Sequence, residues 1–437
     1  MTTGLDGSIY VGGQTLSTTL DGQPNNGVYD CFLAKYSADG KKLWTKVFGG
    51  NQIDSILAMT TGLDGFIYVG GTTRTHLESN NENNINGYIS KYSPDGDVIW
   101  SRFIEGTSDD RYDGIDAMTT GLDGSIYIGA TTSSVTLDGQ TNAGLAGTYD
   151  VVLAKYTPDG EKLWTKLIGG SANESILTII TGLDGSIYVG GHTSSTTLNG
   201  QANADTTGST SDGFVAKYSA EGTKLWTKLI GGTGNEFIYV MTTGLDGSIF
   251  IGAITSSVTL DGQTNAGLAG TYDVVLAKYT PDGEKLWTKL IGGSGDEYIR
   301  IIITGLDGSI FIAGSTLSIT LDGQYNADPT GITRDGFLAK YSATSRPFRF
   351  RFPSKMEFST KEARNFRAYE SGRISYEPAS IYWRISPKLP EGLKFNTRNG
   401  KISGTPTTVF GELSFTVIAY SSVYTTDRHR IKIRCIE

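Results

Sequence analysis

The stretch that decides the fold reads Thr120-Gly-Leu-Asp-Gly-Ser-Ile-Tyr-Ile-Gly-Ala130. Its Gly-Leu-Asp-Gly half is a turn sequence, and the rest is a continuous apolar run bounded by glycines, which is typical of a strand buried on both faces. The pentapeptide Thr-Gly-Leu-Asp-Gly occurs six times, at intervals of 58 to 62 residues. Its first glycines are Gly4, Gly62, Gly121, Gly182, Gly244 and Gly305. The chain therefore repeats one structural unit of about 60 residues.

Each unit predicts four short antiparallel strands. In the third unit, the apolar run at 124–130 is followed by a long polar loop and then by a strand at 150–156. The turn Pro158-Asp-Gly160 leads into an alternating strand at 162–168. Residues 175–180 form a fourth strand, which ends at the next Gly-Leu-Asp-Gly turn.

Tandem repetition of such units predicts an all-β fold, a β-propeller of six repeat units in which four-stranded blades stack face to face. Glycine supplies 58 of the 437 residues, well above average usage. Its excess suits Asp-Gly turns and strand-end pairs such as Gly12-Gly13, where neighbouring blades approach closely. A linear β-solenoid is the alternative, but its coils are usually much shorter than about 60 residues.

Two further signatures recur in step with the turn. Lys-Tyr occurs in all six units, and an aliphatic residue followed by Trp occurs in five. With stretches such as Gly7-Ser-Ile-Tyr-Val-Gly-Gly13 and Asp30-Cys-Phe-Leu-Ala-Lys-Tyr36, residues 1–344 resemble the bacterial β-propeller repeat family. The resemblance implies the propeller fold and the setting of large secreted or surface proteins, and it brings no catalytic motif.

The terminal units leave the number of complete blades open. Met1-Thr-Thr aligns with Met118-Thr-Thr, so the first unit begins near the end of its innermost strand, and the sixth unit lacks the Trp strand. Either a ring closes with imperfect terminal blades or the chain starts inside a longer array. The alternating residues 348–352 would supply the missing outer strand or open the next domain.

Charge divides the chain near Thr344, which predicts domains at 1–344 and 345–437. The second part holds 17 Lys+Arg and 8 Asp+Glu, and the first part holds 20 and 37, so the net charge of −8 is the sum of +9 and −17. The basic residues are scattered singly and form no basic cluster. We therefore expect no nucleic-acid partner.

The second part contains Leu389-Pro-Glu-Gly-Leu-Lys-Phe-Asn396, Asn399-Gly-Lys-Ile-Ser-Gly-Thr-Pro406 and a strand at 411–419. This pattern resembles the Ig-like or cadherin-like domain family that forms tandem stalks in bacterial surface proteins. The resemblance implies a β-sandwich, for which about 90 residues suffice. The family's common Ala-x-Asp ending reads Ala419-Tyr420-Ser421 here, which argues against a calcium site between domains.

The sequence contains few histidines and cysteines that could act in catalysis, and few signals for export or membrane insertion. No apolar run approaches a membrane span, and the first residues do not form an export signal. His76, His192 and His429 occupy non-equivalent positions, the first two in expected loops, so we interpret them as surface residues. We expect Cys31 and Cys435 to be unpaired, buried thiols.

Carboxylates recur after the Gly-Gly pair, where the chain enters the innermost strand. Closing a ring would gather them near the mouth of the central channel, to bind a cation or, as a pair, to do acid–base work. The alternative is that each accepts backbone N–H bonds and fixes the connection, as suits a group present in every blade. The candidates are Asp54, Asp110, Glu174, Glu236 and Glu297, with Asp113 as the alternative in the second unit.

A second acidic set lies in the long loop between the second and third strands of a blade, as Leu-Asp-Gly-Gln. Its members are Asp21, Asp138, Asp261 and Asp322, with Asn199 in the fourth unit. Residues 138–142 resemble the first half of a calcium loop, but no Glu stands at the twelfth place. We expect turns here and no cofactor, with calcium as the alternative, because Asp-Gly forms a turn unaided.

The Lys-Tyr pairs predict packing between blades. We expect each lysine to lie near the acid that begins its strand, as Lys35 near Asp30 and Lys155 near Asp150.

These patterns favour a non-enzymatic, extracellular or cell-surface binding or scaffold protein whose propeller loops contact a protein or a glycan. An enzyme needs one blade that differs chemically from the others. The second unit does differ, in loops 74–84 and 107–113, so a special site would lie beside His76 or Asp109. The alternatives are a calcium-assisted glycan-binding lectin and a propeller hydrolase or lyase, and the oligomeric state stays open.

Overall fold

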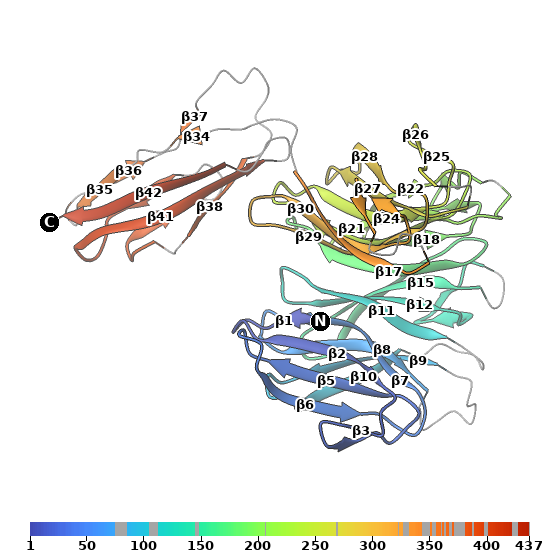
Figure 1. Ribbon diagram of the computed structural model, residues 1–437. Coiled ribbons are helices and arrows are strands. Elements are labelled where there is room, and N and C mark those ends of the chain that lie inside the picture. Colours follow the sequence, from blue (N-terminus) through green and yellow to red (C-terminus); the bar gives the residue numbers. More distant parts are fainter. Residues whose placement is uncertain are drawn as a thin grey trace.

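The computed structural model describes most of the chain. The described residues are 1–74, 85–104, 112–144, 148–205, 207–267, 270–321, 323–326, 332–342, 350–351, 355–359, 361, 364–366, 369–370, 381–386, 389–396, 401–421 and 427–436. Every regular element in this part is a β-strand (Figure 1). No helix long and apolar enough to cross a membrane occurs among these residues.

Each of the six repeats folds as an antiparallel sheet whose strands pair in chain order. The inner strands are β1 (Thr2–Thr3), β7 (Asp54–Thr61), β11 (Asp113–Thr120), β17 (Glu174–Thr181), β23 (Glu236–Thr243) and β29 (Glu297–Thr304). The second strands are β2 (Ile9–Thr15), β8 (Ile67–Thr73), β12 (Ile126–Thr132), β18 (Ile187–Thr193), β24 (Ile249–Thr255) and β30 (Ile310–Thr316). The third strands are β5 (Asp30–Tyr36), β9 (Asn86–Tyr92), β15 (Asp150–Tyr156), β21 (Asp212–Tyr218), β27 (Asp273–Tyr279) and β33 (Asp335–Tyr341). The predicted all-β propeller architecture is confirmed.

The outer strands carry the Trp signature. They are β6 (Lys42–Phe48), β10 (Val98–Ile104), β16 (Lys162–Ile168), β22 (Lys224–Ile230) and β28 (Lys285–Ile291). Among the described residues the sixth sheet has three strands only, as its missing Trp predicts.

A small hairpin follows the second strand in five of the units. The hairpins are β3 (Thr19–Leu20) with β4 (Gln23–Pro24), β13 (Thr136–Leu137) with β14 (Gln140–Thr141), β19 (Thr197–Leu198) with β20 (Gln201–Ala202), β25 (Thr259–Leu260) with β26 (Gln263–Thr264), and β31 (Thr320–Leu321) with β32 (Gln324–Tyr325). The described part of the second unit contains no such hairpin.

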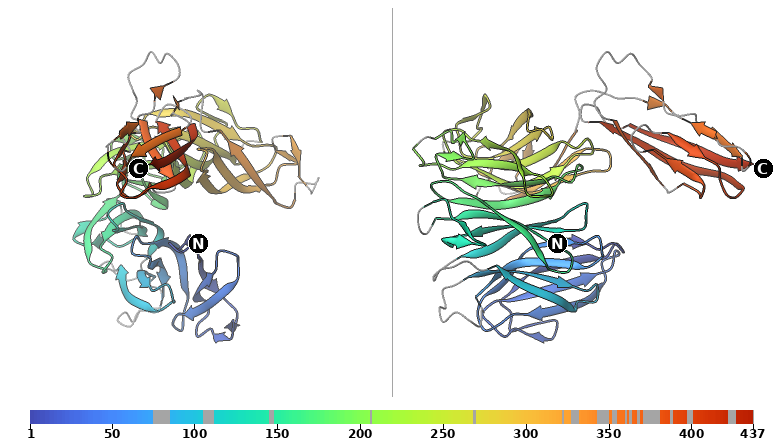
Figure 2. Two further views of the ribbon diagram at one scale, coloured as in Figure 1. Left: turned by 90° about the vertical axis from the view of Figure 1, so that its left-hand side faces the viewer. Right: turned by 180° about the vertical axis from the view of Figure 1, so that it is seen from behind.

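The sheets stack face to face, and the six units follow one another in an arc (Figure 2). Glycine in the second strand makes this stacking possible, because the next inner strand fills the space that a side chain would need. A Cβ atom at Gly129 would lie 2.1 Å from Cδ1 of Ile176 in the following unit, and one at Gly12 would lie 2.5 Å from the sulfur of Met59. The close approach predicted for Gly-Gly pairs is confirmed at Gly12, and Gly129, which precedes an alanine, shows it as well.

The sixth unit shows what stacking covers. Leu276 on β27 is fully buried under the sixth sheet, whereas Leu338, at the same position on β33, is 75% exposed. Ile301 and Ile303 on β29 are also more than half exposed. Within the described residues, the face of the sixth sheet that corresponds to an inter-unit contact is therefore open.

The C-terminal part forms an Ig-like sandwich of two sheets. One sheet contains β35 (Lys355–Ser359), β42 (Asp427–Ile436), β41 (Phe410–Ser421) and β38 (Ile381–Ser386), and the other contains β36 (Arg364–Phe366), β40 (Ile402–Gly404) and β39 (Leu393–Phe395). Phe358, Ile402, Val417 and Ile431 from the two sheets share one buried core.

Two sequence expectations concern the junction between the parts. β34 (Phe350–Arg351) pairs with β37 (Tyr369–Glu370), so this segment joins the C-terminal part rather than the sixth sheet. Residues 348, 349 and 352 and the boundary between 344 and 345 lie outside the described residues. The division into 1–344 and 345–437 therefore stays a prediction.

Candidate binding site

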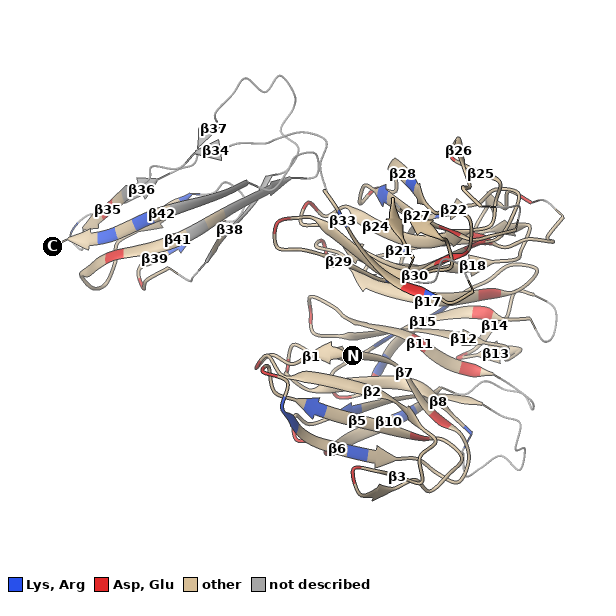
Figure 3. Ribbon diagram, viewed as in Figure 1, with Lys and Arg blue, Asp and Glu red and all other residues tan. Residues whose placement is uncertain are grey.

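Acidic residues gather where the third strand of one unit contacts the inner strand of the next. We call this contact a seam. The acid that begins the inner strand donates its backbone N–H to the residue before the third strand, as Glu174 N does to Tyr149 O at 2.7 Å. This bond brings the first residue of each third strand beside the first residue of the next inner strand. Acidic positions accordingly recur near the same end of successive units (Figure 3).

The inner-strand acids are buried and hydrogen-bonded. Glu174 accepts from the hydroxyls of Thr193 at 2.5 Å and Ser195 at 2.6 Å, and from the backbone N–H of Gly170 at 2.8 Å. Glu236 and Glu297 repeat these three bonds, and Asp54 accepts from the N–H of Gly50 at 2.8 Å.

These acids therefore lie inside the seams. The side chains of Glu174, Glu236 and Glu297 are fully buried, and Asp54 is 5% exposed. Burial raises the pKa of Glu236 to about 7 and also raises that of Glu174. Asp110 lies outside the described residues, and Asp113 begins the inner strand of the third sheet in its place.

The acids that begin the third strands were considered in the sequence only as lysine partners, and the structure gives them another environment. Oδ2 of Asp150 accepts from the N–H of Ala143 at 2.8 Å, while Oδ1 is buried without a hydrogen-bond partner in the described structure. The same holds for Oδ1 of Asp30, Asp212 and Asp273. Burial raises the pKa of Asp273 to about 6. The signal available in the sequence was the fixed position of this Asp at the start of the strand.

The prediction that the Lys-Tyr lysines pair with these acids is wrong. Lys155 binds Asp123 of the Gly-Leu-Asp-Gly turn at 2.8 Å, and the equivalent lysines do the same in the other units. Asp150 begins β15 and Lys155 follows five residues later, so in an extended strand the two side chains point to opposite faces and cannot meet. The predicted packing between units is confirmed, because Lys155 also donates to the carbonyl of Ala220 in the next unit at 3.1 Å.

The hairpin acids form turns and fasten the hairpin to the outer strand. Asp21, Asp138 and Asp261 adopt φ of 50° to 52°, as does Asn199 in the fourth unit. Asp138 binds Lys162 at 2.5 Å and accepts from the hydroxyl of Thr165 at 2.5 Å. The expected turns are confirmed at these positions, whereas Asp322 lies outside the described residues.

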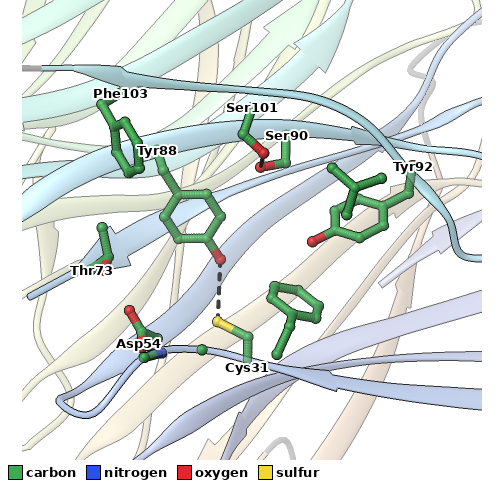
Figure 4. A pocket seen from close by; sticks show the side chains of 12 residues that line it. Cys31, Asp54, Thr73, Tyr88, Ser90, Tyr92, Ser101 and Phe103 are labelled. Carbon is green, nitrogen blue, oxygen red and sulfur yellow. Dashed lines mark hydrogen bonds between the residues drawn. The ribbon is translucent and has the colours of Figure 1, made fainter. Parts of the chain in front are cut away.

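The seam between the first and second units contains a cavity of about 350 Å³ (Figure 4). Two of its lining residues lie on the outer strand β10, where Val98 is 56% and Phe103 is 46% exposed. The residues that line it are Cys31, Phe48, Gly49, Gly50, Asp54, Thr73, Tyr88, Ser90, Tyr92, Val98, Ser101 and Phe103.

The wall combines aromatic rings with hydroxyl groups. Phe48 and Tyr92 stack at 5.3 Å between ring centroids, and the hydroxyls of Ser90 and Ser101 are 2.8 Å apart. Cys31 Sγ lies 3.2 Å from the hydroxyl of Tyr88. Burial raises the pKa of Cys31 to about 12, so this thiol is not ionised at neutral pH and is no nucleophile. The wall also includes the carboxylate of Asp54.

The remaining candidates are histidines, one aspartate and the two cysteines. His76 and Asp109 lie outside the described residues. His192, expected in a surface loop, lies in β18 and packs on the ring of Phe237 at 4.7 Å between centroids. Its burial lowers the pKa to about 4, because the charged imidazolium would lose water. Cys31 and Cys435 are free and buried, as expected.

Comparison with known proteins relates both parts of the chain to others. The family described as "Putative Ig domain" matches residues 341–434. A regulatory protein of Caulobacter vibrioides, FlaEY, is 30% identical over 231 residues, which cover 50% of this chain and 23% of that protein. An uncharacterized WD repeat-containing protein of Acanthamoeba polyphaga mimivirus is 26% identical over 331 residues, or 67% of this chain and 21% of that protein. The chain thus spans less than a quarter of the length of these relatives.

Solved structures with similar folds have low sequence identity. A protein of unknown function from Dyadobacter fermentans is 12% identical, with a TM-score of 0.41, covering 78% of this chain and 92% of that one. A Synechocystis apocarotenoid oxygenase is 10% identical, with a TM-score of 0.39, covering 96% and 85%. A Xanthomonas campestris gluconolactonase is 10% identical, with a TM-score of 0.34, covering 65% and 78%. The chain is an all-β protein of repeated propeller-type sheets with an Ig-like domain at its C-terminal end.

Proposed function

We propose that this chain is a non-enzymatic binding protein, extracellular or at the cell surface, whose repeated turns present a contact surface to a protein partner. The observation that carries the proposal is a row of leucines in the Gly-Leu-Asp-Gly turns. They are between 52% and 80% exposed and are Leu5, Leu63, Leu122, Leu183 and Leu306.

Along the first units, each leucine of the row reaches the Gly-Leu-Asp-Gly turn of the next unit. Cδ1 of Leu5 lies 3.6 Å from the Cβ position of Gly65, and Cδ1 of Leu63 lies 3.9 Å from that of Gly124. Contiguous exposed apolar side chains mark interaction surfaces. Because the stacked sheets fix the spacing, the row offers a partner several equivalent contacts at once.

The chemistry of the described acidic and basic residues supports binding rather than catalysis. The turn and hairpin acids are paired with lysines, and the seam acids are buried, with Asp54 alone among them lining the described cavity. The one thiol in the cavity, Cys31, is held in its neutral form. These roles recur from unit to unit, as expected for a scaffold.

A peptide selection tests the leucine row. Peptides selected from a random phage-displayed library on the intact chain should bind it and should lose at least tenfold in affinity against the double variant Leu63→Asp/Leu122→Asp. The matched control is Leu43→Asp/Leu163→Asp, which changes two similarly exposed leucines on outer strands, 50% and 47% exposed. Equal loss in both variants, or in neither, would contradict the proposed surface.

The cavity supports a second candidate function, glycan binding. Rings of Phe48 and Tyr92 beside the hydroxyls of Ser90 and Ser101 provide the stacking surface and hydrogen-bonding groups that a sugar requires. A glycan array with and without calcium should reveal binding that Ser101→Trp removes, because the indole would fill the cavity. Leu163→Trp on the third unit is the control, and a blank array rejects this candidate.

A further inference from the structure

Four seams contain pairs of buried carboxylates without a basic neighbour. All eight side chains are at most 5% exposed, and none takes part in an ion pair within the described structure. The pairs are Asp30 with Asp54, Asp150 with Glu174, Asp212 with Glu236, and Asp273 with Glu297. Two buried negative charges destabilise a fold by several kcal/mol unless a proton or a cation compensates them.

A second observation does not depend on charge. In each pair, Oδ1 of the third-strand aspartate is buried and receives no hydrogen bond from the described residues. The other oxygen of the same carboxylate accepts a backbone N–H. Ala204 donates to Oδ2 of Asp212 at 2.7 Å, and Ala266 donates to Oδ2 of Asp273 at 2.9 Å. Buried polar atoms nearly always have a partner, so an identical orphan in four units indicates a ligand that binds to oxygen.

In the seam between the first and second units, the orphaned oxygen of Asp30 faces its partner acid Asp54. A Cβ atom placed on Gly49 would lie 2.5 Å from Oδ1 of Asp30 and 2.9 Å from Oδ2 of Asp54, so both oxygens approach one spot. A Cβ atom placed on Gly27 would lie 3.0 Å from the same Oδ1 of Asp30. It would also lie 2.4 Å and 2.8 Å from the carbonyl oxygens of Gln52 and Gly50. The surroundings of the orphan are therefore rich in oxygen and include both carboxylates and carbonyls.

We propose that each of these four seams binds a calcium ion through the orphaned aspartate oxygen, its partner carboxylate and neighbouring backbone carbonyls. Calcium takes six to eight oxygen ligands in irregular geometry, whereas magnesium demands a near-ideal octahedron. Because the two carboxylates belong to successive units, the ion links one unit to the next. The seam between the second and third units carries Asn86 in place of the aspartate, so this seam lacks the second charge.

Calcium uptake by the intact chain tests the proposal directly. After treatment with a chelator, equilibrium dialysis against calcium should give about four ions per chain. The thermal unfolding midpoint should rise with calcium and fall again with the chelator, because the ion binds only the folded seam. Fewer than one ion per chain, or equal midpoints in both conditions, would overturn the proposal and favour carboxylates that share a proton.

Three isosteric variants separate the seams from the other acids. Asp150→Asn should remove about one of the four ions, whereas Asp138→Asn, in the hairpin, should remove none. Asn86→Asp should add one ion by completing the fifth pair with Asp113. Loss of an ion from Asp138→Asn but not from Asp150→Asn would overturn the seam assignment. If Asp150→Asn does not fold, the count in Asn86→Asp still decides, since an unchanged count contradicts the proposal.

Discussion

The second and third units share their strands but differ in the hydrogen bond made by one residue of the outer strand. In the third unit, the hydroxyl of Thr165 on β16 donates to Asp138 of the hairpin at 2.5 Å. In the second unit, where the described residues include no hairpin, the equivalent Ser101 on β10 hydrogen-bonds to Ser90 at 2.8 Å instead. The cavity opens beside this pair. Exchanging Ala and Thr for two serines thus changes the side chains along this seam while the paired strands stay in place.

The largest expected change in stability comes from comparing a buried side chain of the third unit with a half-exposed one beside the cavity of the second unit. Leu153 on β15 is fully buried against the fourth unit, so Leu153→Ala should lower the free energy of unfolding by about 2–5 kcal/mol. Phe103 on β10 is 46% exposed at the cavity, so Phe103→Ala should lower it by less than about 1 kcal/mol. Denaturant titration of both variants measures the difference. Similar losses would mean that the seam of the second unit is as tightly filled as the others.

The next effect concerns a carboxyl group that the third unit has and the second lacks. Burial raises the pKa of Asp116 to about 7, although the hydroxyl of Thr131 donates to it at 2.9 Å, and leucine stands at this place in the second unit. Because the folded-state pKa lies above the unfolded one, Asp116 stabilises the fold at acid pH and loses this contribution as pH rises from about 4 to 7.

Asp116→Asn tests this sign. At pH 8 the variant should be more stable than the wild type by on the order of 2 kcal/mol, because the wild type must hold a charge at a partly buried position there. At pH 4 the two proteins should unfold at nearly the same denaturant concentration, which serves as the internal control. A difference that is the same at both pH values would contradict the buried, raised carboxyl.

The repeats made the propeller predictable, because period and turn chemistry are local properties of the chain. The turn at Asp138 and the close approach at Gly12 follow from Asp-Gly and Gly-Gly within single loops and strands. The partner of Lys155 was mispredicted since nearness along a strand was taken for nearness in space, whereas Asp123 comes from the turn before the preceding strand.

The cavity and the orphaned oxygens were less accessible from sequence. They depend on two units at once: Cys31 and Phe48 meet Tyr88 only after stacking, and Asp150 meets Glu174 only across a seam. The special site predicted beside loops 74–84 and 107–113 of the second unit stays a prediction, because most of both loops lies outside the described residues. In the second unit, Ser90 and Ser101 replace Ala and Thr of the third unit, and this exchange was the available signal for the cavity.

A smaller effect tests the hairpin contact itself. Thr165→Val keeps the shape of the side chain but removes its bond to Asp138, so it should lower the free energy of unfolding by about 1 kcal/mol. Ser101→Ala in the second unit removes a partly exposed bond to Ser90 and should change it by less than about 0.5 kcal/mol. Equal changes in both variants would show that the bond between Thr165 and the hairpin stabilises the fold no more than the bond between the two serines.

The smallest effect comes from the fourth unit, whose hairpin carries Asn199 where the third has Asp138. Lys224 donates to Oδ1 of Asn199 at 2.8 Å, and the amide of Asn199 donates to the hydroxyl of Thr227 at 3.2 Å. Asn199→Asp would convert the first bond into an ion pair and let Thr227 donate, as in the third unit. At this exposed position the gain should be about 0.3–0.5 kcal/mol in low salt and should vanish in about 1 M salt, where the charges are screened. Denaturant titrations at the two salt concentrations measure it, and a gain that persists in high salt would mean that hydrogen-bond geometry rather than charge makes the hairpin contact.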